Sequence, residues 1–418
     1  MGAVLLALGL AGCGSPNGTA SGTTVTAAMR PTAAQAGKCA SIDPATWMGC
    51  LVADHAAFAT TPVSGIAIPG ADNAGTFNLD PEAFDVQSGS HCAATAAQHA
   101  NQGASVQAWS QTQDETITQQ LDAGVRWIDL QVGFNGTDAV SGWRVVQNLY
   151  SDFPLSVYLG QVAAWASTHR GEAVFVDLRT ICYDHDPTPT DEAGLWANFA
   201  TPSTQGTSMV TIKDVAFNPS SLGDGSLATA TLGAITGQGG GGHNVVVLVP
   251  AGSPKLSVLR RQYGVHPVST VENDGAGHSS GTTVVLDRYA NGVAPTTSSD
   301  FEAANRTLEA SPLATDPALG SQVGTGITVV PLVYDFDTAE ALQQATLLTS
   351  FGGLINPSIP TAAAPGALPL PAWESGLWTG TYTRNSVLAA WGHRANVVVT
   401  DGIEHAGFVQ QVVELNAG

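Results

Sequence analysis

The chain has 418 residues, of which 44% are hydrophobic and only 11% are charged, and its formal net charge is −20. A chain of this length and apolar content can bury a large core, either in one large domain or in two ordinary ones. The acidic balance argues against a nucleic-acid partner and against electrostatic docking on anionic lipid, because both need a basic surface.

The N-terminus contains a short apolar run, residues 3–10, which is too short to span a bilayer as a helix. The run leads into Leu-Ala-Gly-Cys at residues 10–13, which resembles the bacterial lipobox, in which the cysteine is lipidated and becomes the new N-terminus. No Lys or Arg precedes the run, so either the start lies upstream or the signal is unusual. We expect a signal segment over residues 1–13 with a lipid anchor at Cys13.

The next segment, residues 14–37, is rich in Gly, Ser, Thr and Ala without a hydrophobic period, which is typical of a flexible tether. The sequence therefore predicts an exported protein, either a cell-envelope lipoprotein or a secreted one, whose folded domain occupies residues 38–418. We expect a monomer that reaches the membrane through its lipid anchor.

Apart from Cys13, the chain has four cysteines, and an exported chain with four cysteines is expected to form two disulfides. Three pairings are open. The short separation favours Cys39–Cys50 as the first choice, which leaves Cys92–Cys182. None of these cysteines has the spacing of a zinc site.

Beyond residue 60, β-rich apolar runs alternate with segments of helical character. Several runs are almost continuous Val, Ile and Leu, as expected for strands that are buried on both faces of a parallel sheet. The predicted strands span residues 64–70, 125–134, 143–150, 173–181, 243–250, 282–289, 327–336 and 396–403. The predicted helices span residues 114–124, 155–169, 337–350 and 407–416. Eight strands that alternate with helices predict an α/β fold, a (β/α)8 barrel with long loop insertions, and an open doubly wound sheet is the alternative.

The helix predicted over 114–124 has clear end signals, with Asp114 as the N-cap and Gly124 as the stop. Two long connections, residues 218–242 and 353–373, are expected to be loops. The first ends in a glycine run, but it lacks the Lys-Ser/Thr pair and the strand-to-helix context of a P-loop, so we predict no phosphate site there.

In a (β/α)8 barrel the active site lies where the carboxyl ends of the strands meet. Polar residues follow nearly all of the predicted strands: Asp72, Asn73, Asp129, Gln131, Gln147, Asn148, Asp177, Arg179, Asp287, Arg288, Asp335, Asp337, Asp401 and Glu404. For any single residue a salt bridge at the rim is the simpler explanation. The set as a whole predicts an acidic functional site with two arginines.

Four segments carry a resemblance to a known family. Residues 68–79, IPGADNAGTFNL, resemble the IPGTHDSGT-type segment that opens the X domain of phosphatidylinositol-specific phospholipase C. Residues 117–132 resemble that family's next block, a helix followed by Gly-[Ile/Val]-Arg and a strand that ends in Leu-Asp-[Leu/Ile]-Arg. Residues 143–178 resemble its third and fourth strands, and residues 395–416 resemble its closing strand and helix. The match keeps the family's order and spacing over most of residues 60–185 and over the C-terminal segment.

The resemblance implies a reaction in which the inositol 2-hydroxyl attacks its own phosphodiester and releases diacylglycerol and a cyclic phosphate. In the family, one histidine acts as the general base and a second protonates the leaving group. An arginine stabilises the phosphate charge, and carboxylates orient the histidines. Histidine suits both proton-transfer roles because its pKa lies near neutral pH.

This sequence differs from the family at the proton-transfer positions. The alignment places Asp72 at the first histidine, Asn73 at the adjacent carboxylate and Gln147 at the second histidine. An exposed carboxylate has a pKa near 4 and is a weak base for an alcohol, and the amide of Gln147 cannot titrate at all. If each role is worth roughly 10²- to 10⁴-fold, their loss would nearly silence the family reaction, although the two effects need not multiply.

The substrate-binding positions also differ in part. Gln131 occupies the position of the phosphate-binding arginine of the bacterial enzymes, and it can donate hydrogen bonds to phosphate but supplies no charge. Asp129 is kept, and Asp401 lies where a late orienting carboxylate is expected. We also expect Arg179 to contact the substrate.

Two features could restore a working site. His185, just after the fourth predicted strand, could replace a lost histidine, although a solvated loop histidine is the simpler interpretation. The other histidines considered are less well placed: His91, His99, His243 and His278. No cofactor is expected, but Asp72, Asp129 and Asp177 could bind a divalent cation such as calcium, as in the calcium-dependent eukaryotic relatives. Calcium needs several oxygen ligands at about 2.3–2.6 Å.

The sequence leaves two functions open. The first is an exported phospholipase C-like phosphodiesterase with a rebuilt site. The second is a catalytically inactive protein of the same fold that binds a phosphodiester or sugar-phosphate ligand, with or without its lipid, at the cell surface. A structural lipoprotein without a ligand would leave the polar strand ends unexplained.

Overall fold

The protein is described by a computed structural model. The described residues are 31–84, 107, 110–135, 138–178, 180–183, 188–203, 208–222, 226–237, 243–250, 263–272, 283–287, 326–332, 396–403 and 407–417. The predicted signal segment, the predicted helix 337–350 and the predicted loop 353–373 lie outside these residues.

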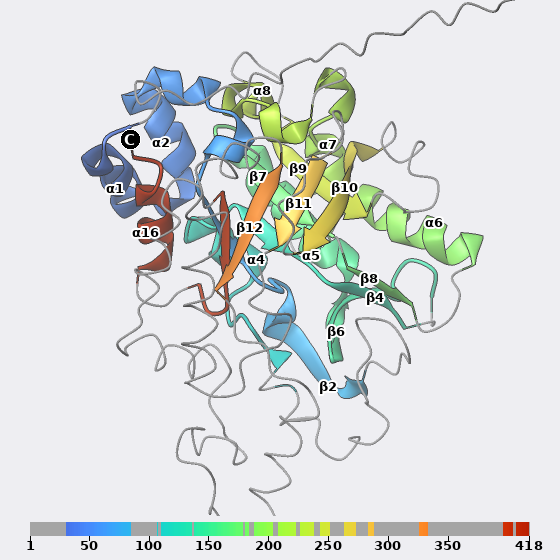
Figure 1. The fold of residues 1–418 in the computed structure, drawn as a ribbon. Helices are drawn as coiled ribbons and strands as arrows, with labels where there is room; N and C mark the ends of the chain where they lie inside the picture. The colour runs from blue at the N-terminus through green and yellow to red at the C-terminus, as the bar shows by residue number, and fades with distance from the viewer. Residues whose placement is uncertain are drawn as a thin grey trace, which may run out of the picture.

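Eight parallel strands close into a barrel (Figure 1). They are β1 (Ile68–Ala71), β3 (Trp127–Asp129), β7 (Val174–Asp177), β9 (Val245–Pro250), β10 (Val265–Glu272), β11 (Thr283–Asp287), β12 (Ile327–Leu332) and β13 (Val397–Thr400). Around the barrel the order is β1-β13-β12-β11-β10-β9-β7-β3, and β3 pairs again with β1. The predicted (β/α)8 barrel is therefore confirmed, and the open sheet is not formed.

The apolar composition of these strands explains why both faces of the barrel sheet are buried. Every residue of β1, β7 and β13 is buried. Inside the β3–β7 pair the rings of Trp127 and Phe175 stack, with centroids 5.8 Å apart. Gly70 in β1 makes room for this packing, because a Cβ at its position would lie 3.1 Å from the Cβ of Trp127 and 2.7 Å from a methyl group of Val399.

A second sheet of five strands lies below the barrel strands in Figure 1. Its order is β2-β6-β5-β4-β8, with β2 (Leu79–Phe84), β4 (Val132–Phe134), β5 (Trp143–Gln147), β6 (Leu149–Pro154) and β8 (Ile181–Tyr183). All five strands belong to chain that leaves the carboxyl ends of β1, β3 and β7. The sheet is therefore an elaboration of the barrel's carboxyl-terminal end, where a (β/α)8 site forms.

The predicted strand 143–150 is the main correction to the fold. We expected it in the barrel, but it forms β5 and the start of β6, which pair antiparallel in the second sheet. Its place in the barrel is taken by β10, residues 265–272, which we did not predict. Residues such as His266 and Pro267 interrupt the apolar pattern of β10, so its sequence does not read as a buried strand.

The described α-helices are α1 (Ala33–Ile42), α2 (Trp47–Asp54), α4 (Ile117–Asp122), α5 (Leu155–Thr168), α6 (Pro189–Ala197), α7 (Ile212–Val215), α8 (Leu232–Thr236) and α16 (Phe408–Glu414). Three of the four predicted helices lie in the described residues and are formed there as α4, α5 and α16, with differences at their ends; the other five described α-helices were not predicted. The N-cap of α4 is Thr116 rather than the predicted Asp114, because the Thr116 hydroxyl accepts from the N–H of Gln119 and completes a capping box. Gly124, with φ +104°, ends this region as predicted.

Short 3-10 helices connect the main elements: η2 (Pro44–Thr46), η3 (Ala56–Thr60), η4 (Val63–Gly65), η5 (Thr76–Asn78), η7 (Asn198–Ala200), η8 (Pro219–Leu222) and η9 (Leu227–Thr229). Together with α8, the last two occupy much of residues 218–242, which we expected to be a loop. Among the described residues, no helix has the length and hydropathy needed to cross a bilayer.

The N-terminal segment closes one side of the molecule. Helix α1 packs against α16 and α2, at the left of Figure 1. Residues 33–37 are part of α1, so the predicted tether does not extend to residue 37. The predicted disulfide Cys39–Cys50 is confirmed and joins α1 to α2. Cys182 is also disulfide-bonded, and its expected partner Cys92 lies outside the described residues.

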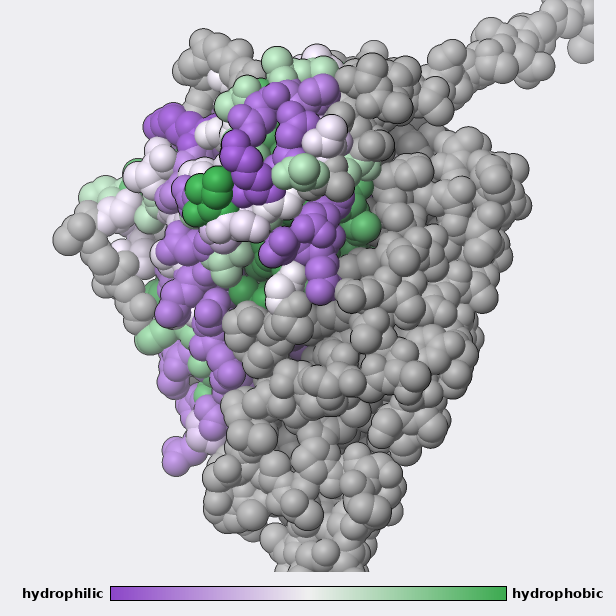
Figure 2. Space-filling view, turned by 90° about the vertical axis from the view of Figure 1, so that its left-hand side faces the viewer, coloured by the Kyte–Doolittle hydropathy of each residue, from purple (hydrophilic) through white to green (hydrophobic). Residues whose placement is uncertain are grey.

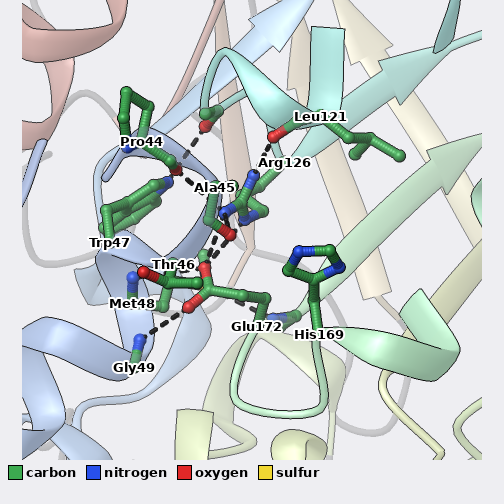
Figure 3. A network of polar contacts seen from close by, with 12 residues as sticks. Pro44, Ala45, Thr46, Trp47, Met48, Gly49, Leu121, Arg126, His169 and Glu172 are labelled. Atoms are coloured by element: carbon green, nitrogen blue, oxygen red, sulfur yellow. Dashed lines mark hydrogen bonds and ion pairs between the residues drawn. The ribbon is translucent and has the colours of Figure 1, made fainter. Parts of the chain in front are cut away.

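A buried ion pair lies at the amino-terminal end of the barrel, which we call its floor, beside the first residues of β3 and β7 (Figure 3). Nη2 of Arg126 is 2.7 Å from Oε2 of Glu172, and both side chains are almost fully buried. The guanidinium lies over the ring of Trp165, 4.6 Å from its centroid. Burial lowers the pKa of Arg126, and the neighbouring Glu172 carboxylate acts in the opposite direction.

The chain between the two bonded cysteines surrounds this ion pair (Figure 3). The carbonyls of Pro44 and Ala45 accept hydrogen bonds from Nη2 of Arg126, at 3.1 and 2.6 Å. On the other side, the N–H of Gly49 in the first turn of α2 donates to Oε1 of Glu172 at 2.7 Å. A carboxylate at a helix N-terminus is favourable, so the pair fixes α2 against the floor of the barrel.

Candidate active site at the carboxyl end of the barrel

Four aspartates lie at one level at the carboxyl ends of four neighbouring strands. The sheet register pairs Asp129 of β3 with Asp177 of β7. It also pairs the last residue of β1 with the last residue of β13, so Asp72 and Asp401 follow at the same level. Asp177 and Asp401 are fully buried, and Asp72 is 7% exposed. The topology therefore brings together carboxylates that are distant in sequence.

Asp72 and Asn73 form a tight turn directly after β1. Asn73 adopts the left-handed conformation with φ +41°, which asparagine tolerates better than most residues. Its Nδ2 donates to Oδ2 of Asp72 at 3.0 Å. The next N–H, that of Ala74, donates to the carbonyl of Asp129 at 2.7 Å and ties the turn to β3. The asparagine thus holds the carboxylate while the backbone fixes the turn across two strands.

The glycine that follows this turn is required by close packing on the second sheet. A Cβ at Gly75 would lie 2.7 Å from Cγ2 of Val145 and 3.2 Å from Cδ2 of Leu130. The next residue, Thr76, is fully buried and begins η5. The Gly-Thr frame of the sequence motif therefore joins the barrel to the added sheet, just beside Asp72.

Gln147 reaches this end of the molecule from the second sheet, as the last residue of β5, and not from a barrel strand. Asn148 follows with φ +59° and forms the turn into β6. Gln131 lies on the neighbouring segment, where its carbonyl accepts from the N–H of Val146 at 3.0 Å. Gln131 and Gln147 are both half-buried. Gln131 thus lies opposite Val146, the residue before Gln147, at the start of the antiparallel β4–β5 pair.

One segment that the sequence analysis did not identify connects these parts. The hydroxyl of Thr112 and the side-chain amide of Gln113 both donate to the carbonyl of Asp72, at 2.9 and 3.1 Å. Nδ2 of Asn148 donates to the hydroxyl of Ser110 at 3.0 Å. These residues belong to no motif, and nothing in their local sequence indicates that they return to the barrel end.

Several predicted site residues lie outside the described part of the chain: Arg179, His185, Arg288, Asp335, Asp337, Glu404, His91, His99 and His278. The described histidines are His55, His169, His243 and His266. His243 precedes β9 and His266 is the second residue of β10, so neither follows a barrel strand. No described histidine therefore takes the place of the two that the family uses.

The predicted cation site is not assembled in this geometry. Among the described residues, three metal-binding side chains bring ligand atoms within 4.8 Å of one another only at Cys39, Cys50 and Asp54. The two cysteines there are joined in a disulfide and offer no thiolate. The carboxylates of Asp72, Asp129 and Asp177 share a level of the barrel but do not form such a group, as a calcium ion would require.

Comparison with known proteins shows which solved structures have a similar fold. No family model matches the chain. PI-PLC X domain-containing protein 1 of Mus musculus is 33% identical over 88 residues, a match that spans 20% of this chain and only 26% of that protein. A pentafluoro-Phe-containing phosphatidylinositol-specific phospholipase C of Staphylococcus aureus superposes with a TM-score of 0.52 at 16% identity, covering 90% of this chain and 98% of that one. A second structure of that enzyme, from work on its membrane binding, gives 0.51 at 15% identity with the same coverage. The chain therefore has the fold of a phospholipase C X domain.

Proposed function

We propose that this chain is an exported phospholipase C-like protein that binds a phosphodiester or sugar phosphate at the carboxyl end of its barrel and cleaves phosphodiesters slowly. The observation that carries the proposal is the Asp72–Asn73 turn. By the sequence resemblance it takes the position of the family's first histidine and carboxylate, and it lies at the level of three further buried or half-buried aspartates. A hydrogen-bonded acid–amide pair at this end of the barrel is a site for ligand chemistry.

Asp72 would act as the proton acceptor in this site. As the nucleophilic hydroxyl attacks phosphorus, its proton would pass to the Asp72 carboxylate, which Asn73 holds through the 3.0 Å hydrogen bond. A carboxylate is a weaker base than the histidine that it replaces, so this step is expected to be slow. Turnover of phosphatidylinositol should therefore be far below that of a histidine-based enzyme.

Departure of the leaving group is the second weak step. Gln147 cannot protonate an alkoxide, because an amide does not titrate near neutral pH. The leaving oxygen must then take its proton from water. Substrates with a stable leaving anion, such as bis(p-nitrophenyl) phosphate, need no such proton and should be cleaved faster than phosphatidylinositol.

Ligand binding without turnover is the second candidate function, and it is favoured by a specific feature. Gln131 lies opposite Val146, the residue before Gln147, and both glutamines are half-buried. A glutamine amide can donate hydrogen bonds to phosphate oxygens or to sugar hydroxyls without supplying charge or a proton. In this form the protein would be a binding protein of the cell surface, anchored through Cys13.

The test is a phosphodiesterase assay on phosphatidylinositol vesicles and on bis(p-nitrophenyl) phosphate, each with and without calcium. We expect slow cleavage of the aryl ester, little cleavage of the lipid and no calcium dependence. The variant Asp72→His/Gln147→His should gain roughly 10²-fold or more on the lipid, because it restores both titrating groups.

The matched control introduces the same two residue changes on the side of the molecule that carries α2 and α16. Asp54→His/Gln410→His replaces two exposed residues there and should leave the rate unchanged. Cleavage of phosphatidylinositol by the wild-type protein at the rate of a histidine-based enzyme would show that our interpretation of the substitutions is wrong. Binding of the lipid headgroup without any cleavage would support the second candidate function.

A further inference from the structure

Gln113 is a fully buried glutamine whose side-chain amide bridges two barrel strands beyond their ends. Its Nε2 donates to the carbonyl of Asp72 at 3.1 Å and to the carbonyl of Thr400 at 2.8 Å. Its Oε1 accepts from the N–H of Ile403 at 3.3 Å. These three contacts all go to backbone that follows β1 or that ends or follows β13.

The side-chain amide of Gln113 takes the place of the next backbone hydrogen bond between β1 and β13. The last backbone bond between β1 and β13 at this end runs from the N–H of Asp72 to the carbonyl of Thr400, at 3.1 Å. Past this bond the described strands end, and their next polar backbone groups need other partners because they are buried. A glutamine amide has the donor and acceptor of a peptide group, so Gln113 extends the pairing by one step.

Thr112 strengthens the same connection from the neighbouring position. Its hydroxyl donates to the carbonyl of Asp72 at 2.9 Å, and its N–H donates to the hydroxyl of Thr76 at 3.0 Å. Its own carbonyl accepts from the N–H of Gly402 at 2.9 Å. Two consecutive residues thus hold both ends of the Asp72 turn and the start of the segment after β13.

The contacts converge on the turn of Asp72, which distinguishes them from ordinary packing of a loop. Helix α4 begins only at Ile117 and has its own cap in Thr116, so residues 110–113 are not needed to start it. Farther back, Ser110 accepts from the side chain of Asn148, the residue after Gln147. The segment is therefore in contact with both substituted acid–base regions.

We propose that residues 110–113, which we call the clamp, position Asp72 for ligand binding and proton transfer, and that Gln113 is the principal positioning residue. The inference rests on the proposed function, because it concerns the carboxylate that would accept the proton. Gln113 acts through the backbone of Asp72 and does not itself touch the reacting atoms. Removal of its amide would leave the carbonyl of Asp72 with the Thr112 hydroxyl as its side-chain donor and should displace the carboxylate beside it.

The test compares two buried glutamines in the full chain. Gln113→Met keeps the length of the side chain and removes its hydrogen bonds. Gln120→Met is the control, because Gln120 is equally buried and donates to the carbonyls of Ala74 and Glu115, at 2.8 and 2.7 Å, without reaching β13. Both changes remove the two hydrogen bonds that a buried amide donates to backbone carbonyls, so both should destabilise the fold to a similar extent.

The readout is the carboxyl carbon resonance of Asp72 in protein labelled with 13C-aspartate, assigned by its loss in Asp72→Asn. We expect Gln113→Met to shift or broaden this resonance at neutral pH and Gln120→Met to leave it in place. The kcat on bis(p-nitrophenyl) phosphate should fall roughly tenfold or more in Gln113→Met, because small displacements of a reacting group are costly.

A resonance that is unchanged in Gln113→Met, or that moves equally in both variants, would overturn the inference. Should Gln113→Met fail to fold, Thr112→Val decides in its place, since it removes one hydroxyl and keeps the side-chain volume. The resonance is read without any turnover. A wild-type protein that cleaves nothing would therefore count against the proposed chemistry, whereas the clamp would still be judged by the position of the Asp72 signal.

Discussion

The contacts of the single residue Arg126 explain why a charge can be buried at the floor of this barrel. All three of its nitrogen atoms donate hydrogen bonds, to Glu172 and to four backbone carbonyls. Burying two charges is costly, and the cost is offset only when geometry and hydrogen bonding are complete. Loss of one partner would leave the other charge buried and uncompensated.

We therefore predict that Glu172→Gln lowers the free energy of unfolding by about 3–5 kcal/mol. The exposed pair Lys38–Asp54, with its nitrogen and oxygen 3.3 Å apart, provides the control. Asp54→Asn should cost less than about 1 kcal/mol, because water screens that pair. Urea unfolding of the wild-type protein and the two variants measures both effects. Equal losses of unfolding free energy in the two variants would contradict this explanation of the buried ion pair.

The residues of the site could be predicted where they lie in a continuous motif or at the end of a predicted strand. The Ile-Pro-Gly and Gly-Thr frame located Asp72 and Asn73 after β1, because a local turn carries them. Gln113 was missed, because it contacts Asp72 across 41 residues of chain and its neighbours in sequence form no pattern. Contacts of that kind are determined by tertiary packing and leave no periodic signal.

At the scale of elements, the second sheet accounts for the error in the predicted strands. Residues 143–150 have a strand-forming composition, and they do form strands. Hydrophobic pattern predicts that a segment is extended but does not say which sheet it joins. The prediction therefore gave the correct number of barrel strands, but it assigned β5 to the barrel in the place that β10 occupies. The turn after β1 is the structural element that connects barrel and added sheet.

That connection gives a prediction about Gly75. In Gly75→Ala the new methyl group would approach Val145 in β5 to 2.7 Å and would push the turn away from the second sheet. Overpacking of this kind costs about 1–3 kcal/mol. Gly171→Ala is the control, because the nearest atom to its added Cβ, in Gly49, lies 3.6 Å away, an ordinary contact.

Thermal unfolding followed by circular dichroism compares the two glycine variants with the wild-type protein. A melting temperature that falls only in Gly75→Ala would show that the site turn depends on the added sheet. If Gly75→Ala is as stable as the wild-type protein, the turn and the second sheet are not tightly coupled. The result bears on the site directly, because Gly75 is three residues from Asp72.

For the whole molecule, the closed barrel was predictable because parallel strands buried on both faces have a distinctive composition. The carboxyl ends of the barrel strands lie together, and this rule also predicts that four aspartates lie at one level: Asp72, Asp129, Asp177 and Asp401. The predicted calcium site could not be judged from sequence, since a shared level does not fix the distances between oxygens. The orientation of each carboxylate depends on contacts such as the one from Asn73.

The described surface offers little that would hold the molecule on a membrane. On the side shown in Figure 2, the described residues are mainly hydrophilic, with small separate hydrophobic areas. Among the described residues the only large hydrophobic side chains that are exposed are Ile42 and Met209, and single residues of this kind are normal on soluble surfaces. A net charge of −20 is repelled by anionic lipid. We propose that acyl chains on Cys13 attach the protein to a membrane.

We therefore predict that Cys13→Ser moves the protein from the membrane fraction to the soluble fraction of a bacterial host that processes lipoproteins. The wild-type protein should incorporate labelled palmitate, and washing its membranes with concentrated salt should not release it, because acyl chains and not charges hold it. Ser15→Ala, two residues along the tether, serves as the matched control and should behave as the wild type does. Membranes that retain Cys13→Ser would show that the folded domain itself binds lipid, in contradiction to the charge and hydropathy of its described surface.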